Sequence, residues 1–242
     1  MELDEYRRMA EVEDAHWWYR ATRALLADVL GPSLTPGGRF LDAGCGTGAT
    51  GAWMAGRGRV VAVDVQAEAL SLYRERHVDA MGLAVADLGR LPFADGSFDA
   101  ALCVTVLYHG AIASPAAAVG ELARVVRPGG VVCLVEPGVQ RLRRAHDRVT
   151  HGARRFSLAQ LRALLTDNGL IVERATGAYS FLVPPAAVKA IWERGGESAS
   201  DLDRHAGGLG GALSRVAAGE RAVLRRASLP FGLSVLAVGR VR

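Results

Sequence analysis

Three aspartates in the first ninety residues have the spacing of a nucleoside-binding site. Asp42 stands two residues before the glycine-rich segment Gly44-Cys45-Gly46-Thr47-Gly48, at the end of a short, mostly apolar run, and a predicted helix follows. Glycines allow a tight turn and let a ligand approach the backbone without meeting a Cβ atom, while the N–H groups at a helix start favour acceptor atoms. Asp64 ends the next apolar run, where a carboxylate can accept hydrogen bonds from both hydroxyls of a ribose. Asp87 ends the third run, where it can accept from the exocyclic amine of adenine while the N–H of Leu88 donates to a ring nitrogen.

The charge of this site distinguishes between two classes of cofactor. The spacing Gly44-x-Gly46-x-x-Ala49 also satisfies a loose dinucleotide fingerprint, so the loop alone would fit an NAD-dependent oxidoreductase. Asp42 lies next to these glycines, where it would repel a pyrophosphate and attract an ammonium group. The three aspartates together describe an adenosine with a cationic tail and no phosphates. S-adenosylmethionine (SAM) is that molecule, and S-adenosylhomocysteine is its product after methyl transfer.

Alternating strand and helix patterns place the three aspartates at one edge of a predicted sheet. The alternation predicts an α/β protein whose mainly parallel sheet is covered by helices on both faces, and nearly continuous apolar runs are typical of such doubly buried strands. The predicted strands are Phe40–Ala43, Val60–Asp64, Leu83–Ala86, Phe98–Val104, Val131–Val135, Ile171–Ala175 and Ser234–Val238. The predicted helices are a segment near Thr50–Gly56, Ala67–Arg76, Pro115–Val126 and a helix capped by Ser157 that runs through Asp167. Residues 127–130 are predicted to form a turn.

Two further segments lie outside this alternation. Residues 1–35 contain the aromatic block His16-Trp17-Trp18-Tyr19 followed by leucines at helical spacing, which predicts an N-terminal helical lid. Residues 36–176 form the predicted cofactor-binding core, and residues 231–242 add its last strand. Residues 177–230 are predicted to be a helical insertion that caps the substrate or makes a contact between two copies of the chain.

Composition excludes several other classes of protein. The 242 residues carry a net charge of +4 and are half apolar, which suffices for a packed core, and the basic residues are scattered, which argues against a nucleic-acid partner. Three isolated cysteines favour a reducing compartment, and the sequence shows no signal peptide and no apolar run of about 18 residues, so a cytoplasmic protein without a membrane span is expected. The histidines and aspartates lack metal-ligand spacing, so no metal is expected. A weak contact between the arginines of residues 215–226 and an anionic membrane surface stays an open alternative.

Four sequence blocks in residues 39–136 give a resemblance to a known family. LDAGCGTG, VVAVD, VADLGRLPFADGSFDAAL and LARVVRPGG resemble, in order and spacing, the class I SAM-dependent methyltransferases of type 11. EDAHWWYRATRALL is similar to a bacterial branch that begins with a His-Trp-Trp-aromatic-Arg block. The resemblance implies a Rossmann-like seven-stranded sheet of order 3-2-1-4-5-7-6 with strand 7 antiparallel. It implies cofactor contacts from the loop residues Gly44, Cys45, Gly46 and Gly48 and from Asp42, Asp64, Val65, Asp87, Leu88 and Cys103, with Arg20 as a charge-matched partner for the methionine carboxylate.

Methyl transfer from SAM needs little covalent catalysis by the protein. The acceptor atom must be placed in line with the methyl carbon, ~3 Å away, with water excluded, and a base is needed only for a hydroxyl or a protonated amine. His109, after the fourth strand, is a candidate base, and Tyr19 is a candidate aromatic partner of the sulfonium. His146 and His151 lie in an arginine-rich run that is either a substrate lid for a phosphate or carboxylate or a solvated charged face.

The sequence therefore predicts a methyltransferase that acts on oxygen or nitrogen of a small-molecule acceptor. A sugar, a lipid-linked glycan and a natural-product intermediate are the expected acceptor classes. Many members of the family carry Asp and Glu where this chain has Thr105 and Tyr108, so the acceptor stays open. Three alternatives also stay open: a SAM-binding enzyme of non-methylating chemistry such as cyclisation, a SAM-bound partner protein that has lost transfer, and an NAD-dependent oxidoreductase.

Overall fold

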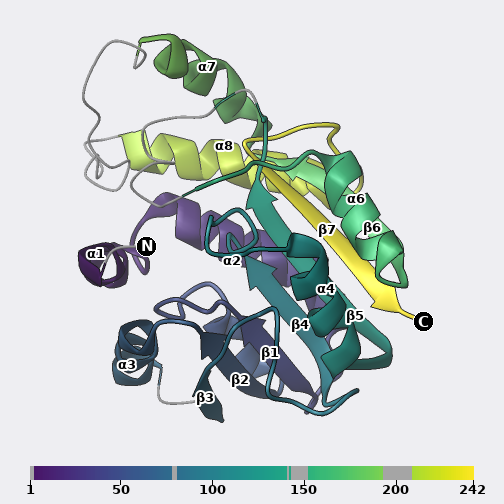
Figure 1. Ribbon diagram of the computed structural model, residues 1–242. Coiled ribbons are helices and arrows are strands. Elements are labelled where there is room, and N and C mark those ends of the chain that lie inside the picture. The colour runs from purple at the N-terminus through teal and green to yellow at the C-terminus, as the bar shows by residue number, and fades with distance from the viewer. Residues whose placement is uncertain (1–2, 78–80, 141, 143–151, 193–208) are drawn as a thin grey trace.

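A seven-stranded sheet runs through the chain in the order β3-β2-β1-β4-β5-β7-β6. The structure is a computed structural model that describes residues 3–77, 81–140, 142, 152–192 and 209–242 (Figure 1). Strands β1 to β5 are parallel to one another, whereas β7 is antiparallel to both β5 and β6. This order and the antiparallel β7 confirm the predicted fold. The strands are β1 (Arg39–Ala43), β2 (Arg59–Asp64), β3 (Gly82–Val85), β4 (Phe98–Val104), β5 (Val126–Pro137), β6 (Leu170–Ala178) and β7 (Ser234–Val241).

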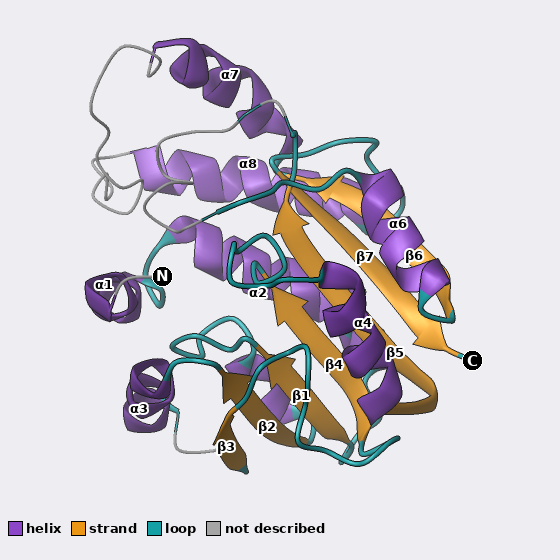
Figure 2. Cartoon of the chain, in the orientation of Figure 1, coloured by secondary structure: helices purple, strands orange, loops and turns teal. Residues whose placement is uncertain are grey.

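Helices cover both faces of the sheet (Figure 2). Successive strand residues point to opposite faces, so Leu41 and Ala101 pack under α4 and α6, whereas Phe40 and Leu102 pack under α2 and α8. The α-helices are α1 (Leu3–Val12), α2 (Trp17–Val29), α3 (Ala67–Arg76), α4 (Pro115–Val125), α6 (Leu158–Asp167), α7 (Val183–Trp192) and α8 (Leu209–Leu224). The 3₁₀ helices are η1 (Gly31–Ser33), η2 (Ala52–Gly56) and η3 (Ser180–Leu182).

Side-chain caps explain where several helices begin. Ser157 accepts a hydrogen bond from the backbone of Gln160, whose side chain accepts from the backbone of Ser157, and this capping box starts α6 at the predicted place. Ser114 caps α4, which has Pro115 in its first turn. His16 caps α2 by accepting from the N–H of Trp18, so the N-terminal segment forms two helices separated by a turn.

Two local predictions differ from the structure. The segment near Thr50–Gly56 forms the 3₁₀ helix η2 and no α-helix, because the glycines around it disfavour regular helix. The predicted turn at residues 127–130 is part of β5, which keeps an irregular pairing with β4 through a register shift between Phe98 and Ala100.

The N-terminal helices and the segment before β7 lie together at the carboxyl end of the parallel strands (Figure 1). Asp28 of α2 pairs with Arg221 of α8 at 3.2 Å and with Arg225, directly after α8, at 2.9 Å. The hydroxyls of Thr22 and Tyr179 are 2.7 Å apart and join α2 to the turn after β6. Within the described ranges, no helix is long and apolar enough to cross a membrane.

Candidate functional site

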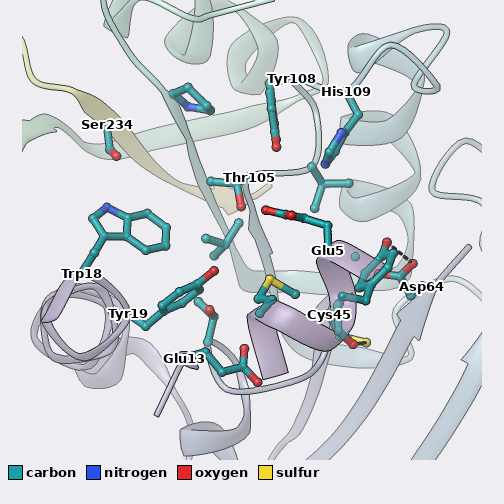
Figure 3. A pocket seen from close by; sticks show the side chains of 18 of the residues that line it. Glu5, Glu13, Trp18, Tyr19, Cys45, Asp64, Thr105, Tyr108, His109 and Ser234 are labelled. Carbon is teal, nitrogen blue, oxygen red and sulfur yellow. Dashed lines mark hydrogen bonds between the residues drawn. The ribbon is translucent and has the colours of Figure 1, made fainter. Parts of the chain in front are cut away.

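A cavity of about 1030 Å³ lies where the parallel strands end (Figure 3). Its floor is the loop after β1, its sides are the residues that follow β2, β3 and β4, and helices α1, α2, α7 and α8 contribute to its roof. Asp42, Asp64 and Asp87 all line this one cavity, together with Val65 and Leu88. The structure thus brings together the three carboxylates on which the sequence argument depends, because each lies at or just beyond the carboxyl end of a neighbouring strand.

Asp64, the last residue of β2, is held in place by the backbone. Its Oδ2 accepts from the N–H of Gly46 at 2.9 Å, and its Oδ1 accepts from the N–H of Gln66 at 3.0 Å. The hydroxyl of Tyr6 on α1 also donates to Oδ1, at 3.4 Å. An ionised carboxylate has about four acceptor positions, so the fixed Asp64 retains capacity to accept from a ribose.

Asp42 is a buried carboxylate with an unmatched oxygen. Its Oδ2 has no hydrogen-bond partner among the described residues. Burial raises the pKa of Asp42 to about 8, and the nearby carboxylates of Asp64 and Glu13 contribute to the increase. A buried acceptor without a donor is costly. Oδ2 lies against Gly51, where an added Cβ would come within 2.0 Å of it, so a cationic group in the cavity would stabilise the charge of Asp42 without needing a bond to this oxygen.

Two glycines of the loop after β1 are required for different structural reasons. Gly44 lines the cavity at φ +72°, and a Cβ there would lie 2.3 Å from Cγ2 of Val106, on the loop after β4. Gly48, at φ +100°, is outside the cavity lining, and a Cβ there would lie 2.5 Å from Cδ2 of Tyr73 on α3. Gly46 and Cys45 line the cavity. The structure therefore places Gly48 in the packing of α3 against the loop, outside the residues that line this cavity.

Two other predicted cofactor residues lie away from the cavity. Arg20 is exposed on α2, while its neighbour Tyr19 is buried and lines the cavity, because adjacent residues of a helix point about 100° apart. Cys103 is fully buried in the core under α4. Val104, which points to the opposite face of β4, and Thr105, which follows the strand, line the cavity instead. His146 and His151 lie outside the described residues.

The loop after β4 carries a feature that the sequence argument missed. Glu136, near the end of β5, is fully buried and accepts three backbone hydrogen bonds from this loop: Val106 at 3.1 Å, Leu107 at 2.8 Å and Tyr108 at 3.1 Å. Thr105 at the loop's start has a left-handed backbone, φ +53°, which is rare for a β-branched residue and concentrates at functional sites. Burial raises the pKa of Glu136 to about 8. The sequence signal for this role of Glu136 was a lone carboxylate directly after the apolar run Val131–Val135.

The candidate base His109 lines the cavity beside Tyr108, and the centres of their rings are 4.1 Å apart. The guanidinium of Arg154 donates to the carbonyls of Leu107, at 3.2 Å, and Ile112, at 2.8 Å, which fixes this loop from its other side. Tyr19 projects into the same space (Figure 3). Burial raises the pKa of Tyr19 above its usual range, so its hydroxyl stays protonated and can serve as a donor but not as a base.

Helix α1 supplies cavity residues that the sequence argument did not single out. Glu5, Tyr6 and Met9 of α1, and Glu13 in the turn directly after it, line the cavity. Glu13 forms an ion pair with Arg76 of α3, and desolvation raises the pKa of its buried carboxyl. The helical spacing of Glu5 and Met9, which places them on one side of α1, was the sequence signal for this face.

Known proteins resemble this chain in sequence and fold. A family model described as a methyltransferase domain matches residues 41–134. Demethylmenaquinone methyltransferase of Beutenbergia cavernae is 40% identical over 121 residues, 49% of this chain and 46% of that protein. Malonyl-(acyl-carrier protein) O-methyltransferase of Erwinia pyrifoliae is 33% identical over 181 residues, 73% of this chain and 67% of that protein.

A solved structure shows the same fold over nearly the whole chain. The protein solved in complex with the Haloferax volcanii Trm112 methyltransferase activator has a TM-score of 0.63 at 20% identity, covering 98% of this chain and 97% of that one. Coverage of the curated relatives is more limited. The chain spans less than half the length of several that it matches, and about two thirds of the Erwinia protein.

Proposed function

Because this chain belongs to the class I SAM-dependent methyltransferases, we propose that it transfers the methyl group of SAM to an oxygen or nitrogen of a small-molecule acceptor. The observation that carries the proposal is that Asp42, Asp64 and Asp87, from three neighbouring strand ends, line one cavity. The name of the Erwinia relative, an O-methyltransferase, supports oxygen as the acceptor atom.

The residues present fit SAM part by part. Asp42 would face the α-ammonium group, and Gly44 and Gly46 would give the methionine part close access to the backbone. Asp64 would accept from the ribose hydroxyls beside Val65, an apolar side chain that is 57% exposed and available to cover the nucleoside. Asp87, whose Oδ1 accepts from the N–H of Gly89 at 2.7 Å, would accept from the adenine amine. SAM supplies an electrophilic methyl group on a cationic sulfur.

The chain's own groups would perform three tasks. Helices α1 and α2 exclude water, with the protonated Tyr19 facing the reacting region. The loop after β4, fixed by Glu136, positions the acceptor atom. The imidazole of His109 takes the proton from a hydroxyl acceptor. We assign residues 1–35 as a lid and residues 177–230 as a cap over the acceptor, because both segments contribute residues to the cavity.

Isothermal titration calorimetry with SAM and with NAD tests this proposal. We expect micromolar SAM affinity for the wild-type chain, and no measurable SAM binding by Asp64→Ala, because the ribose then loses its acceptor. Asp99→Ala is the matched control, since Asp99 pairs with Arg127 at 2.7 Å and lies outside the cavity. NAD binding without SAM binding would instead assign an oxidoreductase.

Product analysis separates methyl transfer from the two other SAM-dependent possibilities. Incubation with SAM and a panel of hydroxyl and amine acceptors should release S-adenosylhomocysteine together with a methylated acceptor. A SAM-bound chain that releases none with any acceptor would support a partner protein, and a changed acceptor without S-adenosylhomocysteine would support non-methylating chemistry.

A further inference from the structure

We infer that the acceptor is a flat, largely apolar molecule that carries one ionisable hydroxyl, and that it binds between α2, α7 and α8. This inference rests on the proposed function and names its substrate class. A cavity of about 1030 Å³ is at the upper end of the range for one drug-sized ligand. It therefore has room for an acceptor beyond the space that the nucleoside requires.

The part of the cavity away from the three aspartates has apolar walls. We call this part the acceptor arm and define it by six lining residues. They are Trp17, Trp18, Leu182, Pro185, Leu213 and Leu233. The aliphatic members of the arm offer no side-chain hydrogen-bond partner to a sugar's hydroxyls, whereas they stabilise an apolar body by removing it from water. The acceptor arm therefore disfavours a free sugar among the acceptor classes considered.

The aromatic wall of the acceptor arm is held in a fixed shape. The ring of Trp18 lies edge-on to Tyr19, with centres 4.9 Å apart, and the ring centre of Trp17 is 6.0 Å from that of Tyr179. Tyr179 is buried in a left-handed conformation, φ +58°, and its backbone N–H donates to Glu220 of α8 at 2.6 Å. Because α8 clamps the turn that supports the indoles, the arm presents preformed flat faces, which favour a planar ligand.

Polar groups gather at the end of the acceptor arm nearest the proposed methyl group. Thr105, Tyr108 and His109 line this end and are seen together in Figure 3. Arg155, which is 8% exposed, lines the cavity and donates from Nη1 to the carbonyl of Gly138 at 3.0 Å. A phenol or enol, with a pKa of about 10 as in tyrosine, gives its proton to the imidazole of His109 more readily than an alcohol does, so a phenol or enol is the better match here.

The reaction at this end balances without a further reactant. The hydroxyl proton passes to the imidazole of His109, and the acceptor oxygen forms a new bond to the methyl carbon. The bond from that carbon to sulfur breaks, and sulfur keeps the electron pair. An apolar methyl ether is the product, with S-adenosylhomocysteine.

The test uses 2-naphthol as the probe and methyl β-glucoside as the polar comparison. Each is titrated into the full chain in the presence of saturating S-adenosylhomocysteine, and tryptophan fluorescence reports occupancy because Trp17 and Trp18 line the arm. We expect 2-naphthol to bind and the glucoside to give no response at millimolar concentration. With SAM in place of its product, we expect 2-methoxynaphthalene by mass spectrometry.

Matched variants on α8 locate the binding. Leu213→Glu places a charge in the arm and should weaken naphthol binding by about tenfold or more, and Leu213→Ala should weaken it by about threefold. Val216→Glu is the control, because Val216 is 49% exposed on the same helix and does not line the cavity. The affinity for S-adenosylhomocysteine should be unchanged in all three variants, which also shows that they are folded.

The outcomes separate the two levels of the argument. Failure of the wild-type chain to bind S-adenosylhomocysteine overturns the proposed function itself. If S-adenosylhomocysteine binds, two results overturn only the acceptor class. One is that the glucoside binds in preference to naphthol, and the other is that Leu213→Glu and Leu213→Ala bind naphthol as well as the wild type does.

Discussion

Asp42 should make SAM binding depend on pH. Burial raises its pKa to about 8 in the free protein. Compared with an ordinary carboxyl pKa of about 4, ionising Asp42 there costs about 5 kcal/mol more in free energy. A bound ammonium group stabilises the carboxylate and lowers this pKa again, so binding below pH 8 must release a proton. The dissociation constant of SAM should therefore fall about tenfold for each pH unit between 6 and 7.5 and level off near pH 8.

Calorimetry in buffers of different ionisation enthalpy measures that proton directly. We expect nearly one proton released per SAM bound at pH 6.5, and close to none in Asp42→Asn, which has no carboxyl to titrate. The variant should also bind more weakly at pH 8, because it lacks the charge that attracts the ammonium group. Equal pH dependence in wild type and Asp42→Asn would refute the assignment of Asp42 to the cationic tail.

The same linkage predicts the stability of the cofactor-free protein. The pKa of Asp42 is higher in the folded than in the unfolded chain, so the folded state holds the proton more tightly. Its contribution to stability is complete below pH ~4 and is lost as pH rises through about 8. Urea unfolding should accordingly show Asp42→Asn gaining stability over wild type as pH increases from 5 to 8.

Three further substitutions test other parts of the structure. Glu136→Gln replaces one of the two carboxylate oxygens by an NH₂ group, which cannot accept a hydrogen bond, so a backbone N–H such as that of Tyr108 loses its partner. Urea denaturation should show a loss of about 2 kcal/mol of unfolding free energy, and an unchanged midpoint would contradict the role of Glu136. His109→Asn should lower the turnover of a hydroxyl acceptor by about 100-fold while SAM affinity is kept, and undiminished turnover would exclude His109 as the base. Gly48→Ala should cost about 3 kcal/mol of unfolding free energy, because φ is +100° and its Cβ meets an aromatic ring at 2.5 Å. Gly56→Ala, with open space around it, should stay within about 0.5 kcal/mol of wild type in the same thermal or urea unfolding series; equal losses would show that crowding at Gly48 is not the cause.

The strands were predictable because their burial leaves a continuous apolar pattern. Runs such as Phe98–Val104 must be apolar on both faces, and the structure has β4 with those bounds. The placement of Asp42, Asp64 and Asp87 in one cavity follows from the same pattern, since ends of adjacent parallel strands share an edge.

Contacts between distant segments were not predictable in this way. The hydroxyl of Tyr6 reaches Asp64 across 58 residues of sequence, and no local pattern in α1 encodes that meeting. Glu136 accepts from residues 28 to 30 positions earlier, so its role depends on the crossover between β4 and β5. The packing of Gly48 against Tyr73 was not predictable either, because the sequence shows that a glycine is required without showing which neighbour requires it.

A crystal structure of the complex with S-adenosylhomocysteine measures the central claim most directly. The account predicts ribose hydroxyls within hydrogen-bonding distance of Asp64, the adenine beside Asp87 and Leu88, and the α-ammonium group next to Asp42. The part of the cavity between α2, α7 and α8 should stay free for an acceptor. Ligand density in another pocket, or a nucleoside turned so that its ribose does not contact Asp64, would contradict the account.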